Sequence, residues 1–194
     1  MIGLHMLVWN EEVLLPRLLN YIKPHVAEMV IIVDDRTVDR TGHIARSYGA
    51  TALPYTLNHD FAAARNYGLA QMIQPWVLQV DADEWPEEGL LKWFHQFLVS
   101  ERASRVDCIS VWRENWIDGQ PIGEQTYEWQ HRLFRRQMRF VGRIHETVIP
   151  QEARRAFAPK EYKLLHHKTS KRQEMRNRQY MEWSEQREIV NASS

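Results

Sequence analysis

The sequence predicts an α/β fold, with a mostly parallel central sheet flanked by helices. In residues 1–100, short apolar runs alternate with segments whose apolar residues have helical spacing, which is typical of strand–helix–strand units. Three of these runs end in polar side chains, at residues 10–12, 34–35 and 81–83. Because parallel strands end at one edge of a sheet, where α/β proteins bind ligands, we expect a ligand site at this edge.

Length and composition narrow the class of protein. The 194 residues suffice for one domain with a hydrophobic core. Lys and Arg number 25, as do Asp and Glu, so no net charge favours a nucleic acid or a membrane. Cys108 is the only cysteine, which excludes an intrachain disulfide and fits a reducing compartment. We expect no signal peptide, because residues 1–9 lack a basic start and are too short, and no apolar run approaches the roughly 20 residues that span a bilayer. We therefore expect a cytoplasmic protein, either free or at the inner face of a membrane.

The first elements follow from local patterns. Residues 3–9 predict a strand, and Pro16 starts a helix that runs to about Ile22. Residues 29–33 form a continuous apolar run, as expected of a central parallel strand that is covered on both faces.

The chain continues with two helices and two strands. Residues 37–50 predict a helix with Thr37 or Asp39 as its cap and Gly49 as its end. A short strand follows at residues 50–55, then a helix over 60–72 whose cap is the aspartate at its first position, Asp60. Residues 76–80 are apolar and β-prone, which predicts a buried strand.

The second half has a different pattern. Pro86 is expected to open a helix with Leu90, Leu91, Phe94 and Phe97 on its buried side. Residues 107–116 predict a strand, and the Asp-Gly pair that follows predicts a hairpin. Residues 131–136 and 139–150 read as further strands or extended loops, and a terminal helix is expected after residue 168.

Asp81 and Asp83 suggest a metal site. The two carboxylates point the same way if the strand continues past Val80, because side chains alternate along a strand. Carboxylate oxygens suit Mg²⁺ or Mn²⁺, which commonly bridge to substrate phosphates. The alternative is a solvated acidic loop, since Asp-x-Asp is common.

Four motifs together resemble a known family. "NEEVLLPRLL", "VIIVDDRTVDRTGHIARSYGA", "DFAAARNYGL" and "WVLQVDADEW" resemble, in order and spacing, the nucleotide-sugar half of family-two glycosyltransferases with the GT-A (Rossmann-like) fold. "RLFRR…FVGRIHE" and "HH…RN" resemble the small bacterial branch that includes lipopolysaccharide-core glucosyltransferases. The resemblance covers about residues 3–180. It implies one GT-A domain over 1–194, with a nucleotide-sugar-binding half (1–100), an acceptor and catalytic half with a small antiparallel extension (101–168), and a C-terminal helix (169–194).

The resemblance assigns roles at the donor site. Trp9 matches an aromatic residue near the base of the nucleotide. Asp35 matches the acid that contacts this base or its ribose, and its neighbour Asp34 is the second candidate for this contact. Arg65 matches an arginine at the nucleotide. The alternatives are a helix-capping acid for Asp35 and an exposed helix arginine for Arg65.

The resemblance also implies a metal and a donor. Asp83 matches the aspartate that holds the metal, and Asp81 the one that reaches ribose or metal. His166 matches a histidine after the last strands that reaches the metal or the diphosphate, and His167 could substitute for it. The expected cofactor is Mn²⁺ or Mg²⁺, and the expected donor is a UDP-sugar.

The acceptor hydroxyl needs a general base. Glu146 lies in the matching stretch, and Phe140 and Val141 before it suggest a strand that places it at the cleft. His145 could orient Glu146 or contact phosphate. The alternatives are a surface glutamate in a strand for Glu146 and a structural hydrogen bond for His145. The competing acids are Glu114, Glu124 and Glu128. The Gln-x-x-Arg-Trp segment of processive polymerases is absent.

Together with the resemblance, these observations predict a metal-dependent inverting glycosyltransferase that transfers a hexose. The acceptor is expected to be a glycan, a lipid-linked molecule, a protein or a modified nucleic acid. Peripheral contact with a membrane is left open. The alternatives are a nucleotidyltransferase of a sugar phosphate and a non-catalytic carbohydrate-binding module. Arg132 and Arg135 could bind phosphates, but strand alternation favours an exposed face for them.

Overall fold

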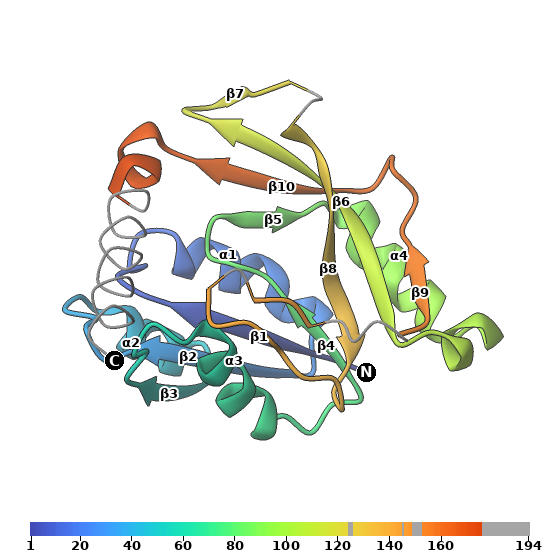
Figure 1. Cartoon of the computed structure of the whole chain (residues 1–194), viewed down its shortest axis with the longest axis horizontal. Coiled ribbons are helices and arrows are strands. Elements are labelled where there is room, and N and C mark those ends of the chain that lie inside the picture. Colours follow the sequence, from blue (N-terminus) through green and yellow to red (C-terminus); the bar gives the residue numbers. More distant parts are fainter. Residues whose placement is uncertain (124–125, 145, 149–152, 176–194) are drawn as a thin grey trace, which may run out of the picture.

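One ten-stranded sheet organises the structure, which is a computed structural model that describes residues 1–123, 126–144, 146–148 and 153–175. The strand order is β3-β2-β1-β4-β8-β6-β10-β5, and β7 and β9 both pair with β6 (Figure 1). The strands are β1 (Ile2–Val8), β2 (Glu28–Asp34), β3 (Thr51–Tyr55), β4 (Trp76–Gln79), β5 (Glu84–Pro86), β6 (Cys108–Ile117), β7 (Gln120–Pro121), β8 (Glu128–Arg135), β9 (Arg155–Phe157) and β10 (Lys163–Lys168).

The first half has the predicted parallel arrangement. β3, β2, β1 and β4 are parallel neighbours, so their carboxyl ends lie at one edge of the sheet. β1 and β2 are almost entirely buried, because helices or loops cover both of their faces. The prediction of a mostly parallel α/β sheet is confirmed.

Helices cover both faces of this sheet. The side chains of α1, α2 and α4 share one core cluster with Leu4 and Met6 of β1, while α3 and residues 138–148 contribute to the cluster on the other face. Among the described residues, no helix has the length and apolar character needed to cross a bilayer. The helices are α1 (Leu15–Ile22), α2 (Thr41–Ser47), α3 (Phe61–Ala70), α4 (Glu88–Leu98) and the 3-10 helices η1 (Lys23–His25) and η2 (Glu101–Arg105).

The second half extends the same sheet instead of forming a separate one. β8 lies between β4 and β6 and is antiparallel to both. β10 pairs with β6, and β5 pairs with β10; in Figure 1 both strands are drawn above β1. The hairpin between β6 and β7 is confirmed, with Asp118 and Gly119 both at positive φ. Residues 139–144 and 146–148 contain no strand, only an isolated bridge between Val141 and Thr147, so the strand expected before Glu146 is wrong.

Two helix starts differ from the prediction. Pro86 ends β5 instead of opening α4, because residues 84–86 pair with β10. α2 begins at Thr41, and neither Thr37 nor Asp39 caps it. The Asp39 carboxylate accepts hydrogen bonds from the backbone N–H groups of Thr41 (2.9 Å) and Glu12 (3.1 Å), which ties the preceding loop to the start of α1.

Other local predictions hold. Asp60 caps α3 by accepting a hydrogen bond from the Ala63 N–H at 2.8 Å, and Gly49 ends α2 at φ +87°. The terminal helix starts at Ser170 and is described as far as Met175. Residues 176–194, over which the helix was also expected, lie outside the described residues.

Close packing of α3 on the sheet predicts that Gly68→Ala is destabilising. A Cβ at Gly68 would lie 2.3 Å from Ile32 Cδ1 and 3.1 Å from His5 Nε2. Overpacking of this kind costs about 1–3 kcal/mol. Gly42→Ala in α2 is the matched control, since its nearest contacts would be at 3.7 Å. Urea denaturation should show a lower free energy of unfolding for Gly68→Ala and an unchanged or higher one for Gly42→Ala. Equal values would mean that α3 packs less tightly than described.

Candidate active site

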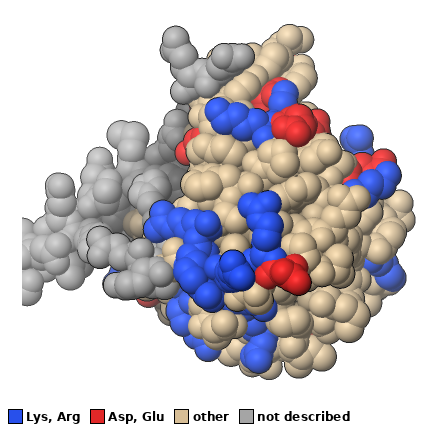
Figure 2. Space-filling model, turned by 90° about the vertical axis from the view of Figure 1, so that its right-hand side faces the viewer, with Lys and Arg blue, Asp and Glu red and all other residues tan. Residues whose placement is uncertain are grey.

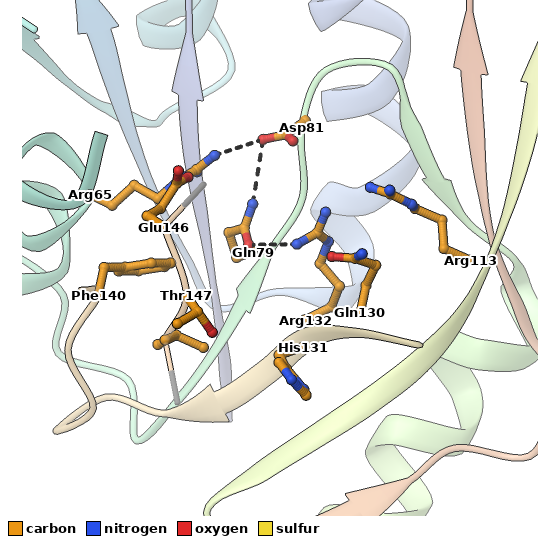
Figure 3. Close-up of a pocket in the computed structure, with 11 residues that line it drawn as sticks. Arg65, Gln79, Asp81, Arg113, Gln130, His131, Arg132, Phe140, Glu146 and Thr147 are labelled. Atoms are coloured by element: carbon orange, nitrogen blue, oxygen red, sulfur yellow. Dashed lines mark hydrogen bonds and ion pairs between the residues drawn. The ribbon is translucent and has the colours of Figure 1, made fainter. Parts of the chain in front are cut away.

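A polar cavity of about 250 Å³ opens beside β4 and β8 (Figure 3). It is lined from one side by α3 and the segment 140–148, and from the other by β4, β6 and β8. The lining residues are Arg65, Gln79, Asp81, Arg113, Gln130, His131, Arg132, Phe140, Glu146, Thr147 and Val148.

Arg65 brings two carboxylates together in this cavity. It lies in the second turn of α3 and is only 6% exposed. Its Nε donates to Glu146 Oε1 at 2.6 Å, and its Nη2 donates to Asp81 Oδ1 at 3.1 Å. Its Nη1 is buried and has no hydrogen-bond partner among the described residues. The arginine therefore neutralises both acids and keeps one donor for another group.

His5 of β1 binds the backbone of Arg65. Its Nε2 donates to the Arg65 carbonyl oxygen at 2.9 Å, and its ring stacks on Phe140 with centroids 5.8 Å apart. Burial and the positive charge of Arg65 lower the pKa of His5 to about 3, so the ring is neutral near pH 7. A neutral histidine can occupy this site beside a guanidinium without charge repulsion.

Asp81 is held as a carboxylate. Burial alone raises its pKa, but the charges of Arg65 and Arg132 and the hydrogen bond from Arg65 together bring it well below its usual value. Gln79 Nε2 also donates to Asp81 Oδ1, at 3.4 Å. The dashed lines of Figure 3 join these groups in one chain from Arg65 to Arg132.

Glu84 binds Arg132, at one end of this chain of hydrogen bonds. No role was predicted for Glu84 from the sequence. It is fully buried, and it accepts from Arg132 Nη2 at 2.5 Å and from Arg113 Nη1 at 3.1 Å. Its Oε2 also accepts from the Asp81 backbone N–H at 3.1 Å, which fixes the turn after β4. The signal in the sequence that could have identified Glu84 is its position directly after the Asp81-Ala82-Asp83 motif.

Arg132 and Arg135 are not the exposed residues that were expected. Arg132 is buried because a bulge in the pairing of β6 and β8 lies at this point, and it also donates to Gln79 Oε1 at 3.0 Å. Arg135 donates to the Ala103 carbonyl oxygen at 2.7 Å and lies over the Trp76 ring. Both guanidinium groups have internal partners.

Asp83 lies beside His166. The chain turns after Val80, with the Glu84 N–H bonded to the Asp81 carbonyl oxygen, so the expected continuation of the strand is wrong. Asp83 Oδ1 is 3.5 Å from His166 Nε2. His166 lies within β10, not after the last strand, and its Nδ1 is 2.9 Å from Asn115 Oδ1.

These two side chains fit a divalent cation. His166 is 4% exposed, and its Nε2 has no hydrogen-bond partner among the described residues. An imidazole nitrogen and a carboxylate oxygen are both ligands for Mn²⁺. The described part of the chain contains no group of three or more His, Cys, Asp or Glu that could hold a metal ion.

The three polar strand ends do meet at this edge. Glu11, which follows β1, is buried, and burial raises its pKa to about 6 against the opposing hydrogen bond and charge of Arg172. Asp83 and Asp81, which follow β4, add to this rise through their negative charge. For the ends of β1 and β4, the convergence expected from the sequence is therefore visible in the electrostatics.

The residues expected at the nucleotide lie at the ends of β1 and β2. Trp9 is 38% exposed, with the Arg36 guanidinium 5.5 Å from its ring centroid. Asp34 is buried and accepts from Arg36 Nε at 2.9 Å. Asp35 is exposed and accepts from the Thr56 hydroxyl; it does not cap α2. Their contact with a nucleotide stays a prediction.

The competing acids differ in position. Glu114 pairs with Lys163 at 2.6 Å and Glu128 pairs with Arg113, and neither lines the cavity. Glu146 does line it. Glu124 and His145 lie outside the described residues. His167, the alternative to His166, has its ring centroid 5.6 Å from that of Trp116.

Comparison with known proteins gives consistent matches. Residues 4–154 match the family described as glycosyl transferase family 2. A TPR repeat-containing protein of Synechococcus elongatus is 35% identical over 154 residues, which cover 76% of this chain and 35% of that protein. The lipopolysaccharide core biosynthesis glycosyltransferase LpsC of Rhizobium meliloti is 27% identical over 158 residues, which cover 73% of this chain and 54% of LpsC. The chain thus spans less than two thirds of the length of either relative.

A solved structure has a similar fold. S. aureus TarS 1-349, crystallised in complex with UDP-GlcNAc, matches with a TM-score of 0.59 at 16% sequence identity. The match covers 86% of this chain and 58% of that chain. At this identity the likeness concerns the fold.

The buried Glu84 network predicts a large stability effect. Glu84→Gln removes the negative charge between Arg132 and Arg113, and we expect the free energy of unfolding to fall by roughly 3 kcal/mol. Glu88→Gln is the matched control, because Glu88 is exposed and pairs with Lys92 on the surface of α4. Urea denaturation should show an unchanged midpoint for the control. A midpoint for Glu84→Gln that equals the parent's would contradict the assigned role.

Proposed function

The chain belongs to glycosyl transferase family 2, and from this premise we propose that it transfers a hexose from a UDP-sugar to an acceptor hydroxyl. The proposed reaction inverts the anomeric carbon and depends on Mn²⁺ or Mg²⁺. The observation that carries the proposal is the cavity in which Arg65 holds Asp81 and Glu146 beside the carboxyl ends of the parallel strands. Open α/β sheets bind their ligands at this edge.

The nucleotide is proposed to bind across the ends of β1 and β2. Trp9 offers an exposed ring to a base, and Asp35 offers an exposed carboxylate to a base or a ribose. The Nη1 of Arg65 has no hydrogen-bond partner among the described residues and is proposed to donate to a phosphate. The TarS structure was determined with UDP-GlcNAc, which supports a UDP-sugar as the donor class.

The metal is proposed to bind at Asp83 and His166, with Asp81 nearby. When bound, the cation neutralises charge that develops on the departing diphosphate. Asn115 Oδ1 accepts a hydrogen bond from His166 Nδ1–H and fixes the orientation of the ring, so that Nε2 faces Asp83. The unpaired, buried Nε2 is the observation that favours a ligand at this point.

Glu146 is proposed as the general base. Its carboxylate takes the proton of the acceptor hydroxyl while that oxygen forms a bond to the anomeric carbon. The bond between the anomeric carbon and the diphosphate oxygen breaks on the opposite side, which inverts the configuration. Arg65 holds Glu146 through one carboxylate oxygen, Oε1, and Oε2 remains for the acceptor.

Family membership argues against the nucleotidyltransferase alternative of the sequence analysis. A nucleotidyltransferase of a sugar phosphate would belong to another family. A non-catalytic carbohydrate-binding module would show no turnover, so the transfer assay below also tests it.

Substitution of the proposed base should slow transfer and leave donor binding intact. Positioned acid–base catalysis contributes about 10² to 10⁴ in rate, so we expect a loss of this size in kcat for Glu146→Gln. The assay is release of UDP from a UDP-sugar, with water as the acceptor. Glu114→Gln and Glu128→Gln are the controls and should keep the parental rate. If one of them is inactive while Glu146→Gln is active, the base is in the β6–β8 region.

Substitution of the proposed metal ligand should remove metal-dependent binding. Asp83→Asn keeps the shape of the side chain but loses its charge, and we expect UDP affinity to become the same in Mn²⁺ and in EDTA. Asp118→Asn, in the β6–β7 turn, is the control and should keep the parental difference. Isothermal calorimetry measures both variants. A parental response to Mn²⁺ in Asp83→Asn would remove Asp83 from the metal site.

A further inference from the structure

Exposed arginines gather at the edge of the sheet opposite the polar strand ends. β4 and β6 begin at this edge, and β8 ends there because it is antiparallel to both. Figure 2 views the molecule from this side and shows Lys and Arg side chains grouped in its lower half. We call this group the arginine surface; it comprises Arg102, Arg105, Arg136, Arg139, Arg154 and Arg155.

Backbone contacts bring these segments side by side. The Arg154 carbonyl oxygen accepts from the Asp107 N–H at 2.8 Å, which joins the start of β9 to the start of β6. The Asp107 carbonyl oxygen accepts from the Arg135 N–H at 2.8 Å, which adds the end of β8. The Arg136 N–H donates to the Pro75 carbonyl oxygen at 3.0 Å, at the start of β4. The arginines therefore form one surface.

Three described acids lie in or beside these segments: Glu101 in η2, Asp107 before β6, and Glu28, which accepts from the Ile73 N–H. The six arginines leave a positive excess over these three acids. Arg154 pairs with Asp107 at 2.7 Å, and Arg139 donates to backbone carbonyl oxygens. Arg105, Arg136 and Arg155 form no ion pair with a described carboxylate. In a chain with 25 basic and 25 acidic residues, such a local excess requires that acids concentrate elsewhere, as they do at the opposite edge.

Exposed aliphatic side chains border the arginines. Val99, at the end of α4 and just before η2, is 89% exposed. Ile73, which precedes β4, is 76% exposed. Arginines beside exposed aliphatic residues are typical of surfaces that bind anionic bilayers, where the charges meet lipid phosphates and the apolar groups enter the acyl boundary. Single-stranded nucleic acids are instead bound by arginines with several aromatic stacking platforms, and the described segments of this surface offer one exposed aromatic ring, Phe157 of β9.

We propose that the arginine surface docks the protein on an anionic phospholipid bilayer. The guanidinium groups bind lipid phosphates, and Val99 and Ile73 enter the interface. The arginine surface lies at the edge of the sheet opposite the polar strand ends, so docking leaves the cavity facing away from the bilayer. This proposal does not depend on sugar transfer, because it concerns binding in the absence of any donor.

The test is co-sedimentation of the full chain with vesicles. We expect binding to phosphatidylcholine vesicles that contain phosphatidylglycerol, and none to phosphatidylcholine alone. Binding should weaken strongly between about 0.1 M and 1 M salt, where the Debye length falls from about 10 Å to 3 Å. Arg105→Glu/Arg136→Glu/Arg155→Glu should reduce the partition constant at least about 100-fold.

Two further variants separate the surface from net charge and from general polyanion binding. Arg17→Glu/Arg46→Glu/Lys92→Glu makes the same charge change at exposed sites on α1, α2 and α4 and should bind vesicles within about threefold of the parent. Val99→Ser/Ile73→Ser should weaken vesicle binding without changing binding to heparin. If a charge-reversed variant does not fold, the corresponding Gln substitutions replace it.

Three results would overturn the proposal. They are an absence of parental binding to the anionic vesicles, an equal loss of binding in both charge-reversed variants, and parental vesicle binding by Val99→Ser/Ile73→Ser. The last result, together with heparin binding, would assign the surface to a soluble polyanion. None of these results bears on the transfer assay, so docking and catalysis can fail separately.

Discussion

A guanidinium buried between two carboxylates organises this protein. Arg65 is almost inaccessible to water, so its charge must be balanced by protein groups. The two acids that balance it are 16 and 81 residues away in the sequence, in the turn after β4 and in the loop after β8. α3, β4 and the segment 140–148 can therefore take only relative positions that satisfy this contact. The cavity is the space that remains between them.

The clustered acids of the stretch 81–84 are tolerated because each faces a different partner. Asp81 faces Arg65, Asp83 faces His166, and Glu84 is enclosed by Arg132 and Arg113. A buried carboxylate costs little only when such partners are present and hydrogen-bonded. The arrangement separates their roles: Glu84 is enclosed within the fold, while Asp81 borders the cavity. Asp83 remains next to an imidazole nitrogen that has no other described partner.

The charges of the chain are divided between two edges of one sheet. Acids follow the strands that end at the cavity edge, and exposed arginines lie where β4 and β6 begin. Because the net charge of the chain is zero, its composition does not reveal that acidic and basic side chains lie at different edges. A donor that carries a metal-bound diphosphate and a surface that carries lipid phosphates would be bound at different edges.

The sequence by itself determined the parallel half of the sheet, the helices that cover it and the convergence of Glu11, Asp34 and Asp81 at one edge. Periodicity and caps report burial and hydrogen bonding within a few residues, and these elements depend on such local information. Only the tertiary structure decided that Arg132 is buried, that Pro86 belongs to a strand and that Glu146 reaches Arg65. Each of these depends on a partner far along the chain, such as Glu84 for Arg132 at a separation of 48 residues. Local patterns contain no record of such a partner, because a charge that is balanced across the fold looks the same in sequence as one that faces water.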